Sequence, residues 1–118
     1  MNIINNITSS PRQNHFLEFS RGSVDLQLIF DPAVTMWRMN VTFTRAGDTE
    51  AQPTIYSVKL ANLTTHFTHR NWPFDFAVED TTGNGVDPFR VDDFETGRSK
   101  LYFLTPDDMI RIRGVDVE

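Results

Sequence analysis

The clearest pattern in the chain is an alternation of apolar and polar residues in two neighbouring stretches, 24–30 and 37–43. Each stretch places its large apolar side chains on one face and polar side chains on the other, which is typical of a strand with one solvated face. Asp31-Pro32 ends the first stretch, because proline has no N–H to donate to a sheet ladder. The link is too short for a parallel crossover, so we expect an antiparallel pair.

Shorter runs predict further strands on both sides of this pair. They lie at 15–19, 55–60, 74–79 and 101–104, with a last strand at 110–117 that bulges at Gly114. Within 55–60, the alternation places Tyr56 on the same face as Val58 and Leu60. The segment 62–67 has no clear pattern, and Thr105-Pro106 is typical of the start of a very short helix, with Thr105 as its N-cap.

These elements predict an all-β fold. Six or seven short strands, each with one apolar face, are best buried in a small antiparallel β-barrel or sandwich. A chain of 118 residues is long enough for one modest core. Residues 1–14 are rich in Asn, Ser and Thr without any strand or helix period, so they are predicted to be a flexible N-terminal arm before a single β domain at 15–118.

The composition narrows the classes of partner. Ten Phe, two Tyr and two Trp supply a large area per residue, which partly offsets the poor surface-to-volume ratio of a small domain, and part of this aromatic surface is expected at an interface. A net charge of −5 disfavours nucleic acid as the main ligand. The apolar runs are too short to span a membrane, the N-terminus does not look like a secretion signal, and the absence of Cys fits a reducing cytoplasm.

No motif in the chain predicts catalysis or a cofactor. There is no G-x-S-x-G elbow and no phosphate loop, so we expect a protein that is not an enzyme. The acidic residues Asp80, Asp87, Asp92 and Asp93 do not have the spacing of a calcium loop, and His66 and His69 lack a second ligand pair for zinc. Solvated or Arg-paired acids are the better interpretation, and no metal site is expected.

Arginines in the second half of the chain are the more interesting candidates. A guanidinium can hold a carboxylate of another protein in a fork of two hydrogen bonds. Alternatively, these arginines pair with acids of the same chain, namely Asp92, Asp93, Asp107 and Asp108, and the sequence does not separate the two hypotheses. The candidate protein-contact residues are Arg90, Asp92, Asp93, Arg98, Arg111 and Arg113.

The order of short motifs resembles that of a known family. It includes a strand ending in Phe30-Asp31-Pro32, then Trp37-Arg38-Met39-Asn40-Val41, Leu60-Ala61-Asn62-Leu63 and Trp72-Pro73-Phe74-Asp75-Phe76. The most specific part is Asp92-Asp93-Phe94 with Gly97-Arg98, followed by Leu101-Tyr102-Phe103-Leu104-Thr105. Over roughly residues 20–117, the chain is similar to the small plug proteins of contractile phage baseplates, the family described from cyanophage baseplates.

The resemblance implies a mainly β structural protein of the virion. Such a protein lies at or near the tube axis of the tail baseplate, contacts hub or tube-initiating proteins, and is assembled in the host cytoplasm without any catalytic residue or cofactor. A homo-oligomer in the assembled particle is compatible with it. We expect the loop 90–98 and the N-terminal arm to make the contacts.

Two rival functions remain open at this point. In a small-ligand-binding β-barrel, the aromatic residues would line a pocket instead of packing a core or an interface. An oligonucleotide-binding barrel would need exposed aromatic residues beside a basic groove, which the acidic charge balance disfavours.

Overall fold

A computed structural model describes residues 2–61 and 72–108 of the chain. In these residues it contains seven strands and a short helical turn at 106–108. The strands are β1 (Asn2–Ile3), β2 (Arg12–Phe19), β3 (Gly22–Asp31), β4 (Met36–Arg45), β5 (Ile55–Lys59), β6 (Asp75–Asp80) and β7 (Ser99–Leu104). The all-β fold expected from the alternating pattern is therefore confirmed.

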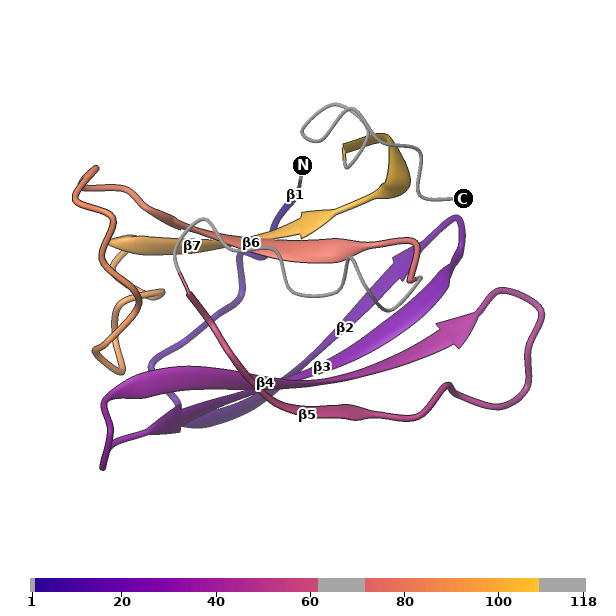
Figure 1. The fold of residues 1–118 in the computed structure, drawn as a ribbon, viewed down its shortest axis with the longest axis horizontal. Helices are drawn as coiled ribbons and strands as arrows, with labels where there is room; N and C mark the ends of the chain where they lie inside the picture. The colour runs from indigo at the N-terminus through magenta and orange to yellow at the C-terminus, as the bar shows by residue number, and fades with distance from the viewer. Residues whose placement is uncertain (1, 62–71, 109–118) are drawn as a thin grey trace.

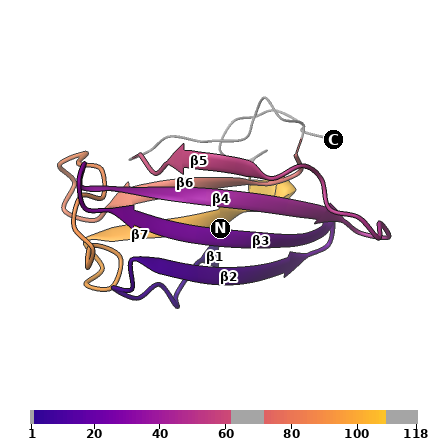
Figure 2. The ribbon, with the colours of Figure 1, turned by 90° about the horizontal axis from the view of Figure 1, so that it is seen from below.

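The strands form two antiparallel sheets that face each other (Figure 1). One sheet has the order β2-β3-β4-β5, and the other has the order β1-β7-β6. Figure 2 shows the four-stranded sheet face-on, with β5 at one edge and β2 at the other. Of the two architectures that the sequence left open, the chain adopts the sandwich.

The long hairpins follow the sequence pattern closely. β2, β3 and β4 pair in regular register over their whole length, and the alternation of β3 and β4 places their apolar residues inside. The turn after β2 leads directly into Gly22, whose φ is 146°. A Cβ atom at Gly22 would collide with the backbone oxygen of Thr44 on the neighbouring strand, so only glycine lets the two strands approach here.

Aromatic residues fill the space between the sheets. Phe43 of the four-stranded sheet lies 5.1 Å, between ring centroids, from Phe74, and Phe19 lies 5.2 Å from Phe103 of β7. Both pairs meet edge to face, the arrangement that ring quadrupoles favour. The largest fully buried side chains are those of Trp37, Phe43, Phe74, Phe76, Leu26, Leu28, Met39, Leu60, Leu101 and Leu104. Most of the aromatic surface in the described residues is therefore core.

The N-terminal segment differs from the flexible arm predicted for residues 1–14. β1 pairs with β7, and the Ile4 N–H donates a hydrogen bond of 2.9 Å to the Leu101 carbonyl. The side chains of Ile4 and Ile7 are buried in the core cluster, and β2 already begins at Arg12. In the described part of this segment, the buried side chains are those of two isolated isoleucines, Ile4 and Ile7, set among polar residues. Two such residues do not produce a strand or helix period, so the sequence pattern does not predict that the segment packs on the core.

The prediction that Tyr56 lies on the same face as Val58 and Leu60 is wrong. The Tyr56 side chain is 71% exposed, whereas Val58 packs against the core. Ser57 has a left-handed φ of 57°, its N–H is bound by the Asn40 side chain at 2.9 Å, and the pairing register of β4 and β5 shifts at this point. The extra residue of this bulge interrupts the alternation and turns Tyr56 outward.

The start of the short helix is confirmed. Thr105 caps it, because the Asp108 N–H lies 3.5 Å from Thr105 Oγ1 while the Thr105 N–H donates to the Asp108 carboxylate at 3.1 Å. The predictions for 62–67 and for the last strand at 110–117 lie outside the described residues. In the part of the chain that the structure describes, no helix is long and apolar enough to cross a membrane.

Candidate protein-contact site

The loop between β6 and β7, residues 81–98, is closed at its base by backbone and hydroxyl hydrogen bonds. The Thr81 N–H donates to the Arg98 carbonyl at 2.9 Å, and Thr81 Oγ1 donates to the Gly97 carbonyl at 2.7 Å. These bonds continue the β6–β7 ladder by one step beyond the last pair, Asp80 and Ser99. The loop thus leaves the sandwich from a fixed pair of strand ends.

Arg98 is the centre of this loop. Its Nε and Nη2 donate to the two carboxylate oxygens of Asp93, both at 2.8 Å, in the fork geometry that arginine favours. Nη2 also donates to the Asp87 carbonyl at 3.0 Å, and Nη1 lies 3.5 Å from a carboxylate oxygen of Asp80. The Arg98 side chain is only 19% exposed. One guanidinium therefore joins three separate points of the loop.

Asp93 organises the turn that precedes it. Its carboxylate accepts hydrogen bonds from the N–H groups of Phe89 at 2.7 Å and Arg90 at 2.8 Å. Burial alone would raise the pKa of Asp93, but the hydrogen bonds from Arg98 and from these two N–H groups outweigh burial and lower it. The carboxylate is therefore held in its charged form by partners from its own loop.

Asp80, the last residue of β6, likewise binds the backbone at the start of the loop. It accepts hydrogen bonds from the Thr82 hydroxyl at 2.7 Å and from the N–H groups of Thr82 and Val86 at 3.0 and 2.9 Å. These bonds, the Thr82 hydroxyl first among them, lower the pKa of Asp80 to about 2, and the positive charge of Arg98 acts in the same direction. In return, Asp93 and Asp80 raise the pKa of Arg98.

The loop is also fixed to the core of the sandwich. The indole N–H of Trp37, a fully buried residue of β4, donates to the Arg90 carbonyl at 3.0 Å. The ring of Phe94 packs edge to face on Trp37, with 5.6 Å between ring centroids. Because Trp37 cannot move without disturbing the core, the loop is a rigid part of the domain.

Four of the exposed residues of this loop are Val86, Phe89, Arg90 and Asp92, which we call together the loop patch. Phe89 is 39% exposed and lies between two guanidinium groups, 5.3 Å from that of Arg90 and 5.0 Å from that of Arg98. Cation–π contacts of this kind hold the ring in one orientation. The patch thus combines an aromatic group, an arginine and an acid on a rigid base.

The structure separates the predicted contact residues into two groups. Arg98 and Asp93 are paired with each other inside the loop, so the intrachain alternative is the one observed for them. Arg90 and Asp92 are exposed on the loop patch. Arg111 and Arg113 lie outside the described residues.

Some functional neighbours were not identified from the sequence. Pairing with an arginine is one of the sequence-based interpretations of Asp80, whereas the hydrogen bonds of Asp80 to the turn and the contacts of Phe89 and Trp37 with the loop are not predicted. The run Asp-Thr-Thr-Gly-Asn-Gly after β6 is a signal for Asp80, because Asp often binds the backbone two residues on at the start of a turn. The contact between Trp37 and Arg90, 53 positions apart, has no local signal.

The same geometry bears on metal binding. Among residues 2–61 and 72–108, the structure contains no group of three or more His, Asp or Glu residues placed to hold a metal ion. Asp80 and Asp93 share the guanidinium of Arg98 as their common cation.

No protein-family model matches this chain, and no curated protein matches it. The resemblance to baseplate plug proteins therefore stays a prediction based on the motifs alone.

Proposed function

We propose that this protein is a non-enzymatic structural protein that acts by binding other proteins through the loop patch. The observation that supports the proposal is that one group of residues fixes the loop internally while another group is exposed. Arg98, Asp93 and Asp80 fix the backbone from inside, while Phe89 and Arg90 face solvent. Aromatic and arginine side chains held rigidly on a surface are the groups that contribute most to protein–protein binding.

The setting we propose is the baseplate of a contractile phage tail. The most specific part of the motif resemblance, Asp92-Asp93-Phe94 with Gly97-Arg98 and Leu101 to Thr105, begins in the same loop and includes Asp92 of the loop patch. In this proposal the chain is a plug at or near the tube axis, and the loop patch contacts a hub or tube-initiating protein. It is assembled with them in the host cytoplasm and needs neither a catalytic group nor a cofactor.

The packing of the aromatic residues favours this role over the small-ligand-binding module. Trp37, Phe43, Phe74 and Phe76 are packed in the interior of the sandwich against other side chains. A ligand-binding barrel would instead use such residues to line a pocket.

The location of the protein in purified virions tests the proposal. Mass spectrometry of intact tails and of isolated baseplates should find the chain enriched with the hub and tube-initiating proteins. Cross-links from Lys59, which lies 3.5 Å from Asp87 of the loop, should reach one of these proteins. A protein found in infected cells but missing from virions would contradict the virion role, whereas cross-links to other tail proteins would contradict the proposed position.

A further inference from the structure

β2 is an edge strand of the four-stranded sheet, with β3 on its only paired side among the described strands. The hydrogen bond from the Phe30 N–H to the Pro11 carbonyl shows which residues face β3. Because the register is regular, every second residue from Pro11 is in a hydrogen-bonded pair with β3. The N–H and C=O groups of Arg12, Asn14, Phe16 and Glu18 therefore point away from the sheet, toward the open edge.

Two of the usual protections against pairing with another strand, a proline and a bulge, are absent from the eight residues of β2. Within residues 2–61 and 72–108, the one hydrogen bond to the outward N–H and C=O groups is that of the Ser10 hydroxyl to the Arg12 carbonyl, at 2.9 Å. The open stretch from Asn14 to Glu18 also carries an apolar side chain, that of Phe16, which is 58% exposed.

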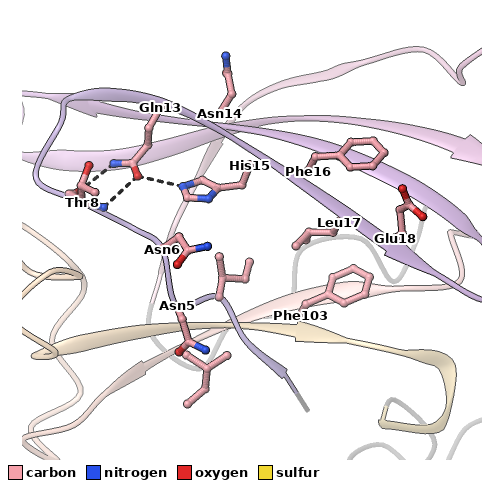
Figure 3. A pocket seen from close by; sticks show the side chains of 12 residues that line it. Asn5, Asn6, Thr8, Gln13, Asn14, His15, Phe16, Leu17, Glu18 and Phe103 are labelled. Carbon is pink, nitrogen blue, oxygen red and sulfur yellow. Dashed lines mark hydrogen bonds between the residues drawn. The ribbon is translucent and has the colours of Figure 1, made fainter.

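The space beside the edge is also open. A groove of about 720 Å³ runs between β2 and the N-terminal segment, because the facing sheet ends in a β1 of only two residues. In Figure 3, the segment from Asn5 to Thr8 crosses to the sheet near Gln13, while Phe16 and Glu18 lie further along β2. A strand added to β2 would cover this side of the sandwich.

The side chains of β2 are complementary to those of a second, antiparallel β2. The exposed residues at the two ends of its outer face have opposite charges, Arg12 at the start and Glu18 at the end. An antiparallel partner centred on His15 places each Arg12 opposite the Glu18 of the second copy, twice by symmetry. The same register pairs Asn14 with Phe16, so the outward N–H and C=O groups meet in hydrogen-bonded positions.

We propose that two copies of this chain form a symmetric dimer by pairing their β2 strands antiparallel about His15. The two four-stranded sheets then become one continuous sheet, and the two Phe16 rings become diagonal neighbours across the twofold axis. Registers centred on Asn14 or Phe16 also align the backbone groups, but they separate Arg12 from Glu18. Charge complementarity selects the register centred on His15.

Light scattering coupled to size-exclusion chromatography of the full purified chain tests this dimer over a dilution series. Glu18→Arg leaves two pairs of arginines facing each other, so we expect the dissociation constant of the dimer to rise about tenfold or more. Arg12→Glu should raise the dissociation constant in the same way, because it leaves two pairs of glutamates facing each other. The double variant Arg12→Glu/Glu18→Arg exchanges the charges and should restore dimerisation.

Glu50→Arg is the matched control, because it makes the same change of charge in the exposed loop between β4 and β5. It should leave the dissociation constant unchanged, and circular dichroism should show that all variants are folded. A monomeric wild type up to the limit of solubility would overturn the dimer. A double variant that stays as weak as the single variants would overturn the register. The test uses the chain alone, so its outcome is independent of the proposed role in the virion.

Discussion

At the scale of single residues, Arg98 is the side chain on which the loop depends most. The sequence left open whether it binds a neighbouring protein or pairs within its own chain, and its two hydrogen bonds to Asp93 and its bond to the Asp87 carbonyl lie within the loop. Removing one partner of a largely buried ion pair leaves the other charge without compensation. Arg98 therefore acts on the stability of the domain, and on binding only through the shape of the loop.

We predict that Arg98→Ala lowers the free energy of unfolding by about 3 kcal/mol, because Asp93 is almost completely buried and loses its cation. Urea denaturation measures this change. Arg90→Ala is the matched control, since it makes the same substitution at an exposed position of the same loop and should cost less than about 0.5 kcal/mol. Equal losses for the two variants would contradict the central position of Arg98.

The lowered pKa values of Asp80 and Asp93 predict how stability depends on pH. The pKa of Asp80 is about 2 in the folded chain, compared with about 3.9 for an unperturbed Asp in an unfolded one. The stabilisation is therefore complete above about pH 4 and is lost as the pH falls toward 2, because the unfolded chain then binds more protons. We expect Asp80→Asn to be less stable at neutral pH and to lose less stability between pH 4 and 2.

Urea denaturation at a series of pH values measures this slope. Asp48→Asn, in the exposed loop after β4, is the control and should keep the slope of the wild type. An unchanged slope in Asp80→Asn would show that the Asp80 carboxylate is not the group that titrates.

At the scale of elements, the alternation of apolar residues predicted β3 and β4 well because each strand has one buried and one solvated face. β5 was predicted with the wrong face for Tyr56, because a bulge at Ser57 depends on the Asn40 side chain of the neighbouring strand. β1 was missed, since two residues cannot show a period. What the sequence pattern lacks in both cases is information on contacts between strands.

The N-terminal segment gives a direct test of β1 and the residues that follow it. Ile7 is 6% exposed and belongs to the core cluster, whereas Ile3 in β1 is 39% exposed. We predict that Ile7→Ala lowers the free energy of unfolding by about 2–4 kcal/mol, the usual cost of a cavity left by a buried aliphatic side chain. Ile3→Ala, the same substitution in the same segment, should cost less than about 1 kcal/mol.

Chemical denaturation of the two variants measures the difference. If Ile7→Ala is as stable as the wild type, the segment does not contribute to the core and behaves as the flexible arm that its composition suggested.

At the scale of the whole molecule, the sequence predicted six of the seven described strands, β2 to β7, but not how the strands divide between sheets. The order β2-β3-β4-β5 follows from consecutive neighbours, whereas the pairing of β1 with β7 joins strands that are far apart in the sequence. For the candidate protein-contact site, too, the sequence did not predict which residues contact each other. Arg90, Asp92, Asp93 and Arg98 lie in one loop, as their sequence positions imply, but their separation into internal and exposed residues depends on how the loop folds onto Trp37.

The sandwich therefore offers two surfaces with different origins. The loop patch is rigid because Arg98 and Trp37 fix it from below, and the β2 edge is available because the facing sheet ends early. The first is proposed to bind other virion proteins, and the second to bind another copy of the chain. Since they lie on different elements, each can be disrupted without the other.

The most direct test of the central claim is the number of copies of the protein per purified virion for variants of the loop patch. Phe89→Ser/Arg90→Glu removes the aromatic group and reverses the charge, and Tyr56→Ser, an exposed aromatic residue of β5, is the control. Loss of a binding hot spot costs about 2 kcal/mol or more. We therefore predict that incorporation of the double variant falls more than tenfold and that incorporation of the control does not change. Both variants should be as stable as the wild type. Incorporation of the folded double variant at the wild-type level would contradict the loop patch as the binding surface.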